Sequence, residues 1–480
     1  MVKLSTAISL ICFCGGIYAS PASTDVAGRS MSFRRLNTTR FAIPEIPHSW
    51  KEFVGKFDNY LKSIISRRRS KDPSSLEYSD VAAFSWLPTP EEIASLVNTP
   101  DADHNERTAR VLNVPTYGNW TRRGWNLRIR GLVYKQMPLS NRTTNSFTRM
   151  FMMGRKATAL PREQYARAVN MTQMIFSVPQ KNIRLLFRLT PMGALGSPPP
   201  DHPGTQYIET PRKTNRAGNY DSFARIQDAS ATGLIPGNET IHTQAISVQV
   251  EGGYPGNIID SYLVPTHGFS IVSDVDDVLR VSMIWHLKQC LIRLFAQPFV
   301  PWMNLPEVYA DWARKYPQAH FHYLTVTPEQ LTRPYIAFVQ NIYPPGSFDS
   351  RVVNVSDITA LLLPRRSLMD KLFETFPERK FILVGDTSNG NIMRDYPAMV
   401  HRFPGQVQCI LIRNTSATDP TFFFPYNTKG FKKLPQKIYM FFRTPDDIAN
   451  LDFENGECYN ASVPQNLTFS LQGLPFGINP

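Results

Sequence analysis

From residue 268 onward, short apolar segments alternate with segments of helical periodicity. The apolar segments read FSIVSD, FHYLT, KFILVGD and VQCILIRN, at residues 269–274, 321–325, 380–386 and 407–414. Apolar residues recur at helical spacing between them, at 281–295, 306–316, 333–343, 365–376 and 392–403. Parallel strands need long crossover connections, so this alternation is typical of a parallel sheet with helices on both faces. We therefore predict a Rossmann-like α/β fold for residues 268–420.

The residues before this part, 106–267, show a different pattern. Runs with partly alternating polarity occur at 126–135 (NLRIRGLVYK), 182–190 (NIRLLFRLT) and 245–250 (AISVQV). Turn-rich spacers separate them, among them a Pro-rich stretch at 193–205. We predict a β-rich, sandwich-like domain here, and the pattern indicates no function for it.

The ends of the chain are predicted to lie outside both domains. Residues 1–22 resemble a secretory signal peptide, since Lys3 precedes a short apolar stretch that ends in small residues. An uncleaved anchor is the alternative, although the stretch is short for a bilayer. Residues 23–105 form a variable region with an amphipathic helix at 49–66, which either packs on the protein's own core or contacts a membrane surface. Residues 421–480 are a C-terminal extension.

Glycosylation acceptors favour a secretory route, and the cysteines indicate that the protein is not a disulfide scaffold. N-x-S/T triplets occur at Asn37, Asn119, Asn141, Asn170, Asn238, Asn354, Asn414, Asn460 and Asn466. Loss of the signal peptide leaves Cys290, Cys409 and Cys458, which allow at most one intramolecular disulfide and leave its pairing open. We predict a glycoprotein that is secreted or resides in the secretory-pathway lumen.

The formal net charge of +13 favours anionic partners. The dense basic run SRRRSK, at 66–71, has neither the length nor the interleaved aromatic residues of a nucleic-acid groove. We expect no nucleic-acid partner, and we expect phosphorylated substrates or an anionic membrane face instead.

Carboxylates follow two of the predicted strands. Asp274 and Asp276 come at the end of the first strand, and Asp386 ends the strand at 380–386. The carboxyl ends of parallel strands meet at one sheet edge, and clustered oxygen ligands suit Mg²⁺. With the cation countering its charge, one carboxylate can attack phosphorus while the other handles protons. We assign Asp274 as nucleophile and Asp276 as acid/base.

Other residues of this part suit the same chemistry. Thr325 ends a strand, where its hydroxyl can hold a phosphoryl oxygen, and Arg365 and Arg366 open a helical segment and can face the same anion. We predict no catalytic role for Asp277. Its side chain either supports the outer shell of the metal or faces solvent. A Ca²⁺-binding loop is disfavoured because its later Glu is missing.

Four ordered segments, GFSIVSDVDDV, FHYLTVTPEQL, PPGSF and FPERKFILVGDTSNGN, together resemble the catalytic domain of the actin-patch-associated phosphatidate phosphatase family, within the haloacid dehalogenase-like superfamily. The resemblance implies Mg²⁺-dependent conversion of phosphatidate to diacylglycerol through an aspartyl-phosphate. It makes Asp274 the nucleophile, Asp276 the acid/base and Thr325 the second-motif hydroxyl. It makes Asp386 a metal ligand. Arg365 is the choice for the basic third motif, with Arg366 and Lys371 as rivals.

Two positions depart from the family pattern. Val278 replaces a Thr, and Asn391 stands where an acidic residue is expected. We predict a metal site made of Asp274, Asp276, Asp386 and Asn391, in which the Asn brings no charge. The short connection between Asp274 and Thr325 leaves little room for a large lid, which favours a bulky lipid substrate.

Two alternative functions stay open. The first is a phosphatase of the same mechanism that acts on a non-lipid ester. The second is a catalytically idle protein that binds anionic membranes peripherally, and Asn391 is the feature in its favour.

Overall fold

The fold is that of a computed structural model, which describes residues 108–136, 140–152, 160–175, 177–192, 203–227, 232–253, 258–351, 364–419, 428–465 and 467. The predicted signal peptide and the region 23–105, with its helix at 49–66, lie outside the described residues. Among the helices that are described, none is long and apolar enough to cross a bilayer.

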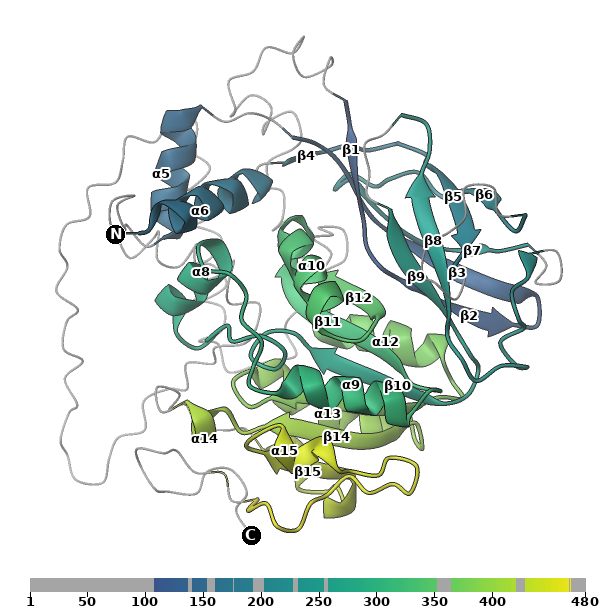
Figure 1. Cartoon of the computed structure of the whole chain (residues 1–480), viewed down its shortest axis with the longest axis vertical. Helices are drawn as coiled ribbons and strands as arrows, with labels where there is room; N and C mark the ends of the chain where they lie inside the picture. The colour runs from purple at the N-terminus through teal and green to yellow at the C-terminus, as the bar shows by residue number, and fades with distance from the viewer. Residues whose placement is uncertain are drawn as a thin grey trace, which may run out of the picture.

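A six-stranded parallel sheet forms the centre of the second half of the chain (Figure 1). Its strands, in spatial order, are β12 (Gly346–Arg351), β11 (His320–Pro328), β10 (Phe269–Asp274), β13 (Lys380–Asp386), β14 (Val407–Arg413) and β15 (Tyr439–Phe442). Every neighbouring pair is parallel. The predicted α/β class with a parallel sheet is confirmed.

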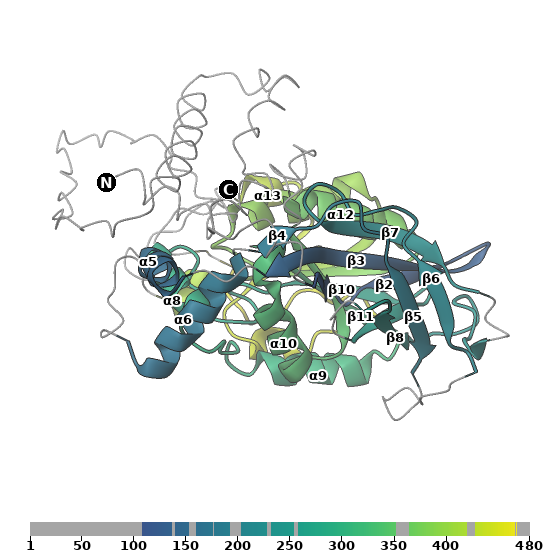
Figure 2. The same cartoon turned by 90° about the horizontal axis from the view of Figure 1, so that it is seen from above.

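Helices cover both faces of this sheet, as Figure 2 shows. One face carries α8 (Leu287–Phe295), α9 (Leu305–Lys315) and α10 (Thr332–Ile342), and the other carries α12 (Pro364–Thr375) and α13 (Gly390–Arg402). Neighbouring strand residues point to opposite faces, so Ile271 joins the first hydrophobic core and Val272 the second. Burial on both sides explains why β10 and β13 are continuous apolar runs.

Most predicted elements agree with the observed ones to within a residue or two, apart from the extra length of β11 and the run predicted at 182–190, whose strand begins only at Leu186. The exception among the helices is α8, which begins at Leu287 and not at residue 281. The strands β12 and β15 were not predicted. β15 lies within the predicted C-terminal extension, yet it pairs in parallel with β14 as the sixth strand. Between β14 and β15 come the short helices α14 (Thr415–Thr418), η5 (Lys429–Phe431) and η6 (Gln436–Ile438), and α15 (Asp446–Ala449) follows β15.

The first half of the described chain forms a nine-stranded, mostly antiparallel sheet. Its strands are β1 (Arg110–Asn113), β2 (Tyr117–Thr121), β3 (Gly124–Gln136), β4 (Ser177–Pro179), β5 (Leu186–Pro191), β6 (Gln206–Glu209), β7 (Asn219–Arg225), β8 (Gln244–Val250) and β9 (Ile259–Val264). The long β3 pairs with β1, β2, β4 and β7. A separate sandwich-like domain stays a prediction.

A helical hairpin that was not predicted interrupts this sheet between β3 and β4. It consists of α5 (Asn141–Phe151) and α6 (Arg162–Ile175). Met152, Ala168 and Met171 belong to the same hydrophobic core as α8, α9 and α10. The hairpin therefore packs against the helices of the parallel sheet (Figure 1).

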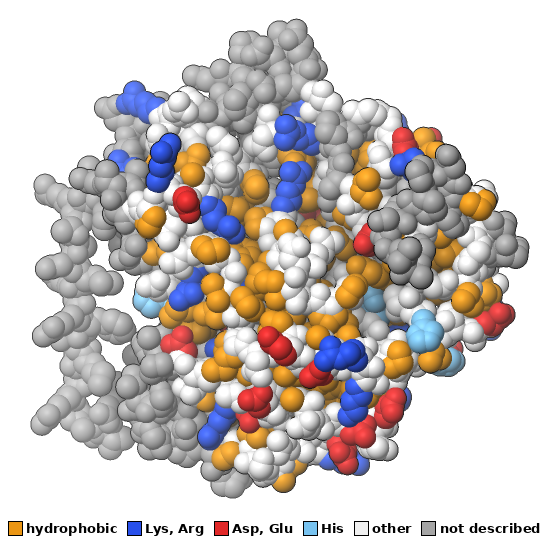
Figure 3. Space-filling model, viewed as in Figure 1, with side chains coloured by type: hydrophobic (Ala, Val, Ile, Leu, Met, Phe, Trp, Pro, Cys, Tyr) orange, Lys and Arg blue, Asp and Glu red, His pale blue; other side chains and the backbone are white. Residues whose placement is uncertain are grey.

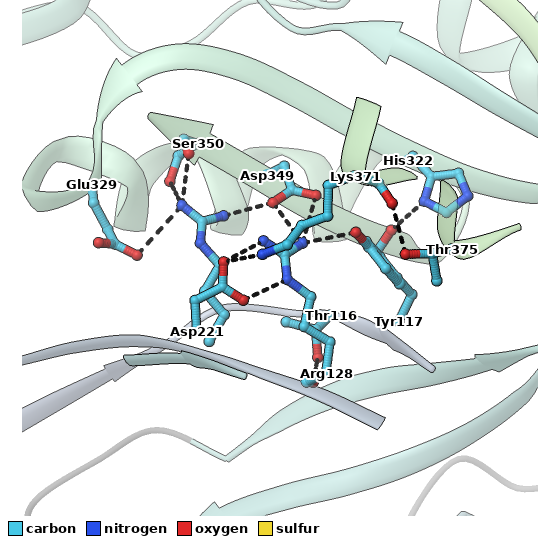
Figure 4. A network of polar contacts seen from close by, with 12 residues as sticks. Thr116, Tyr117, Arg128, Asp221, His322, Glu329, Asp349, Ser350, Lys371 and Thr375 are labelled. Carbon is cyan, nitrogen blue, oxygen red and sulfur yellow. Dashed lines mark hydrogen bonds and ion pairs between the residues drawn. The ribbon is translucent and has the colours of Figure 1, made fainter. Parts of the chain in front are cut away.

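Charged side chains join the two sheets where β3 meets β12 (Figure 4). Arg128 Nη1 lies 2.9 Å from Asp349 Oδ1, and Arg130 Nη1 lies 2.8 Å from the same oxygen. Arg128 Nε also donates to Asp221 Oδ1 at 2.8 Å. Both arginines are buried, and Asp349 is the carboxylate that these two cations of the other sheet share.

The cysteine pairing left open by the sequence is settled in this structure, where Cys409 of β14 is bonded to Cys458 across 5.4 Å between their Cα atoms. Cys290 is a buried free thiol. Of the predicted glycosylation acceptors, Asn141, Asn170 and Asn238 are exposed and Asn414 is buried. Glycosylation itself stays a prediction, and the buried Asn414 is the least accessible of these acceptors.

We predict that Asp349→Asn destabilises the protein by about 3 kcal/mol, because it removes the charge that the buried Arg128 and Arg130 share and leaves them only Asp221 and Glu329 as carboxylate partners. Urea unfolding followed by circular dichroism measures the change. Asp370→Asn is the matched control, since Asp370 pairs with Arg402 nearer the surface and should cost less than about 1 kcal/mol. Equal losses in the two variants would contradict the importance of the buried junction.

Candidate active site

The carboxyl ends of three neighbouring strands bring most of the predicted site residues to one edge of the sheet. Asp274 ends β10, Thr325 lies near the end of β11 and Asp386 ends β13. Strands β11 and β13 flank β10, and the chain runs outward through β11 and β12 before it returns to β13. The strand order therefore reverses beside β10, which is where open α/β sheets bind ligands.

Asp274 is held by Arg365. The Nη2 atom of Arg365 donates to Asp274 Oδ1 at 2.8 Å, and both side chains are only 1% exposed. The other oxygen, Asp274 Oδ2, is buried and has no hydrogen-bond partner in the part of the chain that is described. Burial raises the pKa of Asp274, although the Arg365 guanidinium opposes that effect. Oδ2 is the oxygen left for a ligand or for chemistry.

Asp386 offers a second oxygen of the same kind. Ser388 donates its backbone N–H to Asp386 Oδ1 at 2.7 Å, and the Ser388 hydroxyl donates there as well. Asp386 Oδ2 is buried without a hydrogen-bond partner among the described residues. Burial raises the pKa of Asp386, and repulsion from the Asp274 carboxylate raises it further. The two aspartates are thus close enough to repel each other.

These two oxygens fit a hard cation. Mg²⁺ in proteins is usually held by one or two carboxylates together with water and substrate phosphate oxygens. A cation held by Asp274 and Asp386 would remove the repulsion between these two carboxylates. Within the described ranges, no group of three His, Cys, Asp or Glu side chains is placed to hold a metal. The fit therefore rests on this pair of aspartates, and Mg²⁺ binding stays a prediction.

Asp276 lies among hydroxyl groups. Its Oδ1 accepts hydrogen bonds from Ser282 Oγ at 2.6 Å and from the Tyr335 hydroxyl at 3.0 Å, and its Oδ2 accepts one from Thr325 Oγ1 at 2.9 Å. The Nε of Arg280 is 3.7 Å from Oδ1. Both oxygens of Asp276 thus have hydrogen-bond partners, whereas Asp274 Oδ2 has none among the described residues. Its part in a metal site stays a prediction.

Two of these partners, Ser282 and Tyr335, were not predicted from the sequence. Tyr335 belongs to α10, and its ring is buried in the core of that face. Its hydroxyl reaches Asp276 because α10 packs against β11. The hydrophobic periodicity of the sequence does not reveal this contact. Ser282 was detectable in principle, since a hydroxyl six positions after Asp276 lies in the same loop.

Asp277 has a structural role that the sequence did not predict. Its Oδ1 accepts the backbone N–H groups of Ser282 and Met283 at 2.9 and 2.7 Å, and its Oδ2 accepts that of Ile284 at 2.8 Å. These bonds shape residues 275–284, which we call the site loop. They also explain why α8 begins later than predicted.

The remaining predicted residues lie on the helices that follow. Asn391 is in the first turn of α13, where the Asn389 side chain caps the helix by accepting the Asn391 backbone N–H at 3.1 Å. Gly385 lets α13 approach closely, since a Cβ there would be 2.6 Å from Ile392 Cγ2. The metal role of Asn391 stays a prediction.

Arg365 is the candidate for the basic motif that contacts Asp274. The rival Lys371, one and a half turns later on α12, binds Asp221 at 2.6 Å instead. No described contact joins the other rival, Arg366, to Asp274. The structure thus brings Arg365 to the predicted nucleophile, while its part in the reaction stays a prediction.

Backbone strain gathers near this edge of the sheet. Among the described residues, the non-glycine residues with positive φ are Asn182, Asp277 (59°), Met283 (58°) and Met303 (48°). The first lies in the nine-stranded sheet region, and the others lie in the site loop or in the connection from α8 to α9. Such conformations cost about 1–3 kcal/mol each and are retained where surrounding contacts enforce them, often at functional sites.

The fold and these residues define an α/β protein with an aspartate-centred candidate active site. Residues 269–414 match the family described as "Phosphatidate phosphatase APP1, catalytic domain", so this part of the chain is similar to that catalytic domain. The resemblance noted in the motifs is thereby confirmed.

The sequence identity to a curated relative is low. Over 207 residues the chain is 21% identical to phosphatidate phosphatase APP1 of Saccharomyces cerevisiae. The match covers 41% of this chain and 34% of the yeast protein, so the chain spans about a third of the length of that relative.

We predict opposite effects of Asp386→Asn on stability without and with Mg²⁺. Burial raises the pKa of Asp386 to about 8, so between about pH 4 and pH 8 the unfolded chain releases this proton while the folded protein keeps it, and the stability falls across that range. In chelator at alkaline pH, Asp386→Asn should therefore raise the melting temperature. Added Mg²⁺ should stabilise the wild type and leave the variant unchanged.

Thermal unfolding with and without chelator measures both effects, and Asp311→Asn serves as the control because Asp311 makes only an exposed ion pair with Arg314. A variant that responds to Mg²⁺ as the wild type does would show that Asp386 is not a ligand.

Proposed function

We propose that this protein is a Mg²⁺-dependent phosphatidate phosphatase of the haloacid dehalogenase-like type, which converts phosphatidate to diacylglycerol and phosphate. The observation that carries the proposal is the position of Asp274, at the end of the central strand in the part of the chain that matches the phosphatidate phosphatase family. Arg365 binds only Oδ1 of Asp274, so Oδ2 has no hydrogen-bond partner among the described residues. This oxygen is suited to nucleophilic attack.

In the first half-reaction, Asp274 Oδ2 attacks the phosphorus of phosphatidate. A bond forms between Oδ2 and phosphorus, and the bond from phosphorus to the diacylglycerol oxygen breaks. Asp276 in its protonated form gives its proton to that leaving oxygen. The products of this step are diacylglycerol and an aspartyl-phosphate on Asp274.

In the second half-reaction, water attacks the phosphorus of the aspartyl-phosphate. Asp276, now a carboxylate, takes a proton from this water as its oxygen bonds to phosphorus. The bond from phosphorus to Asp274 Oδ2 breaks, so inorganic phosphate leaves and Asp274 returns as a carboxylate. Asp276 is protonated again and ready for the next substrate.

The remaining residues act on charge and position. Arg365 holds the Asp274 carboxylate in place and can stabilise phosphoryl oxygens, while the Thr325 hydroxyl positions Asp276. Asp274 and Asp386 would hold Mg²⁺, with Asp276 and Asn391 as further predicted ligands. When bound, the ion would counter the charge of the carboxylates and of the transferring phosphoryl group.

We also propose that the protein acts outside the cell or in the lumen of the secretory pathway. The pairing of Cys409 with Cys458 supports this, because disulfides persist in oxidising compartments. The exposed acceptors at Asn141, Asn170 and Asn238 agree with it. The expected partners are phosphatidate or a related anionic phospholipid, with peripheral contact to the membrane that carries it.

The test is phosphate release from phosphatidate by purified wild type and Asp274→Asn. We expect release that requires Mg²⁺ in the wild type and a loss of at least about a thousandfold in the variant, since the nucleophile is removed. Release that persists in Asp274→Asn would contradict the proposed mechanism.

The same assay separates the alternatives. Hydrolysis of water-soluble phosphomonoesters in preference to phosphatidate would favour a non-lipid phosphatase of the same mechanism. Binding to phosphatidate vesicles without turnover would favour the idle membrane-binding protein.

We predict that Tyr335→Phe lowers kcat about tenfold and changes KM little, because the hydroxyl orients Asp276 and a hydrogen bond to a carboxylate is worth about 1.5–3 kcal/mol. Steady-state kinetics with phosphatidate measures the split. Tyr323→Phe is the matched control, since it removes a buried hydroxyl that donates only to the Pro344 carbonyl. Similar kcat values for Tyr335→Phe and the wild type would argue against this positioning role.

A further inference from the structure

An uncharged loop borders the candidate active site. Residues 297–304, with the sequence QPFVPWMN, connect α8 to α9 and are called the rim loop here. Val300 is 49% exposed and Met303 is 53% exposed, and these two large apolar side chains are only three positions apart. The loop therefore presents an apolar tip to its surroundings.

The backbone of the rim loop is bonded to the site loop. Val281 donates its N–H to the Val300 carbonyl at 3.0 Å, and Trp302 donates its N–H to the Leu279 carbonyl at 3.0 Å. These bonds hold the rim loop at a set distance from Asp276 and Asp277, which belong to the same site loop.

Two aromatic side chains anchor the rim loop from below. Phe299 packs against the Tyr335 ring at 4.9 Å between centroids, and the Arg280 guanidinium lies 3.6 Å from the Phe299 centroid. At the other end Trp302 is buried, with the Arg413 guanidinium 4.1 Å from its ring. Tyr335 donates to Asp276 and Arg413 donates to the Asp277 carbonyl, so the partners of both aromatic anchors also bind the site loop.

The exposed apolar pair is thus not a poorly packed end of the core. Val300 follows the half-buried Phe299 and Met303 follows the buried Trp302, yet both Val300 and Met303 are exposed, and Met303 keeps a strained backbone with φ of 48°. On the face in Figure 3, hydrophobic side chains gather over the middle of the molecule, among α8, α9 and α10, with both basic and acidic side chains around them.

We propose that the rim loop is a membrane-contact element, in which Val300 and Met303 enter the headgroup region of the bilayer that carries the substrate. This inference rests on the proposed function, because a lipid substrate brings a bilayer to the site. The absence of acidic residues in the loop and the Arg167 guanidinium, 5.4 Å from the Phe299 centroid, suit the anionic phosphates of that surface.

The test compares Val300→Ser/Met303→Ser with Ile241→Ser/Ile258→Ser. The control pair removes side chains of similar exposure, 56% and 60%, from loops of the nine-stranded sheet. Sedimentation with phosphatidylcholine vesicles that contain phosphatidate measures binding. Phosphate release is measured on the same vesicles and on a water-soluble short-chain phosphatidate.

We expect the rim variant to lose about tenfold in vesicle binding and in kcat/KM on vesicles, as the removed apolar groups no longer enter the bilayer. Its activity on short-chain phosphatidate should equal that of the wild type, and the control pair should change neither. Vesicle binding and activity equal to those of the control pair would overturn the inference. So would a change of oligomeric state in the rim variant, because the patch would then bind a second copy.

A second measurement does not depend on turnover. An environment-sensitive fluorophore on Val300→Cys should shift to shorter wavelength when vesicles are added, and one on Ile241→Cys should not. The buried Cys290 leaves the introduced thiol as the accessible one among described cysteines. No shift would overturn the inference even if phosphatidate is hydrolysed, whereas a shift without hydrolysis would leave it standing and contradict the proposed function.

Discussion

Three carboxylates are fully buried at one edge of the parallel sheet, and the local structure is organised around the cost of that burial. An unpaired buried charge is expensive, and each aspartate is compensated differently. Asp277 accepts three backbone N–H groups, whereas Asp274 has one arginine on one oxygen and Asp386 has the Ser388 donors and the Thr415 hydroxyl on one oxygen. Compensation therefore decreases from the loop-forming Asp277 to the two aspartates that retain an unpartnered oxygen, which is where a cation would gain most.

Helix α12 links this edge to the rest of the molecule. Its first turn carries Arg365, which binds Asp274, and its middle carries Lys371, which binds Asp221 of β7. Asp221 in turn holds Arg128, whose guanidinium also reaches Asp349 of β12. The nine-stranded sheet thus helps to set the position of the helix that presents Arg365. This gives a physical role to a part of the chain for which the sequence indicated none.

The sequence predicts well what depends on continuous burial or on chain order. β10 and β13 were predicted to the residue because they are apolar runs between two helix layers, and strand-end logic placed Asp274, Thr325 and Asp386 at one edge. β12 was missed because GSFDSR is polar. Its Asp349 and Ser350 are buried only because Arg130 from the other sheet binds them. Tyr335 was missed for a related reason, since its hydrogen bond to Asp276 depends on how α10 packs.

The side chains that position the predicted acid/base also support the rim loop. Tyr335 bonds Asp276 and packs on Phe299, while Arg280 lies beside Asp276 and stacks on the same ring. With such shared supports, the apolar tip and the carboxylate keep a constant separation. A loop that enters a bilayer from this position would hold the site at one depth relative to the lipid phosphates. Phosphatidate could then reach Asp274 by moving along the membrane surface, without closure of a lid.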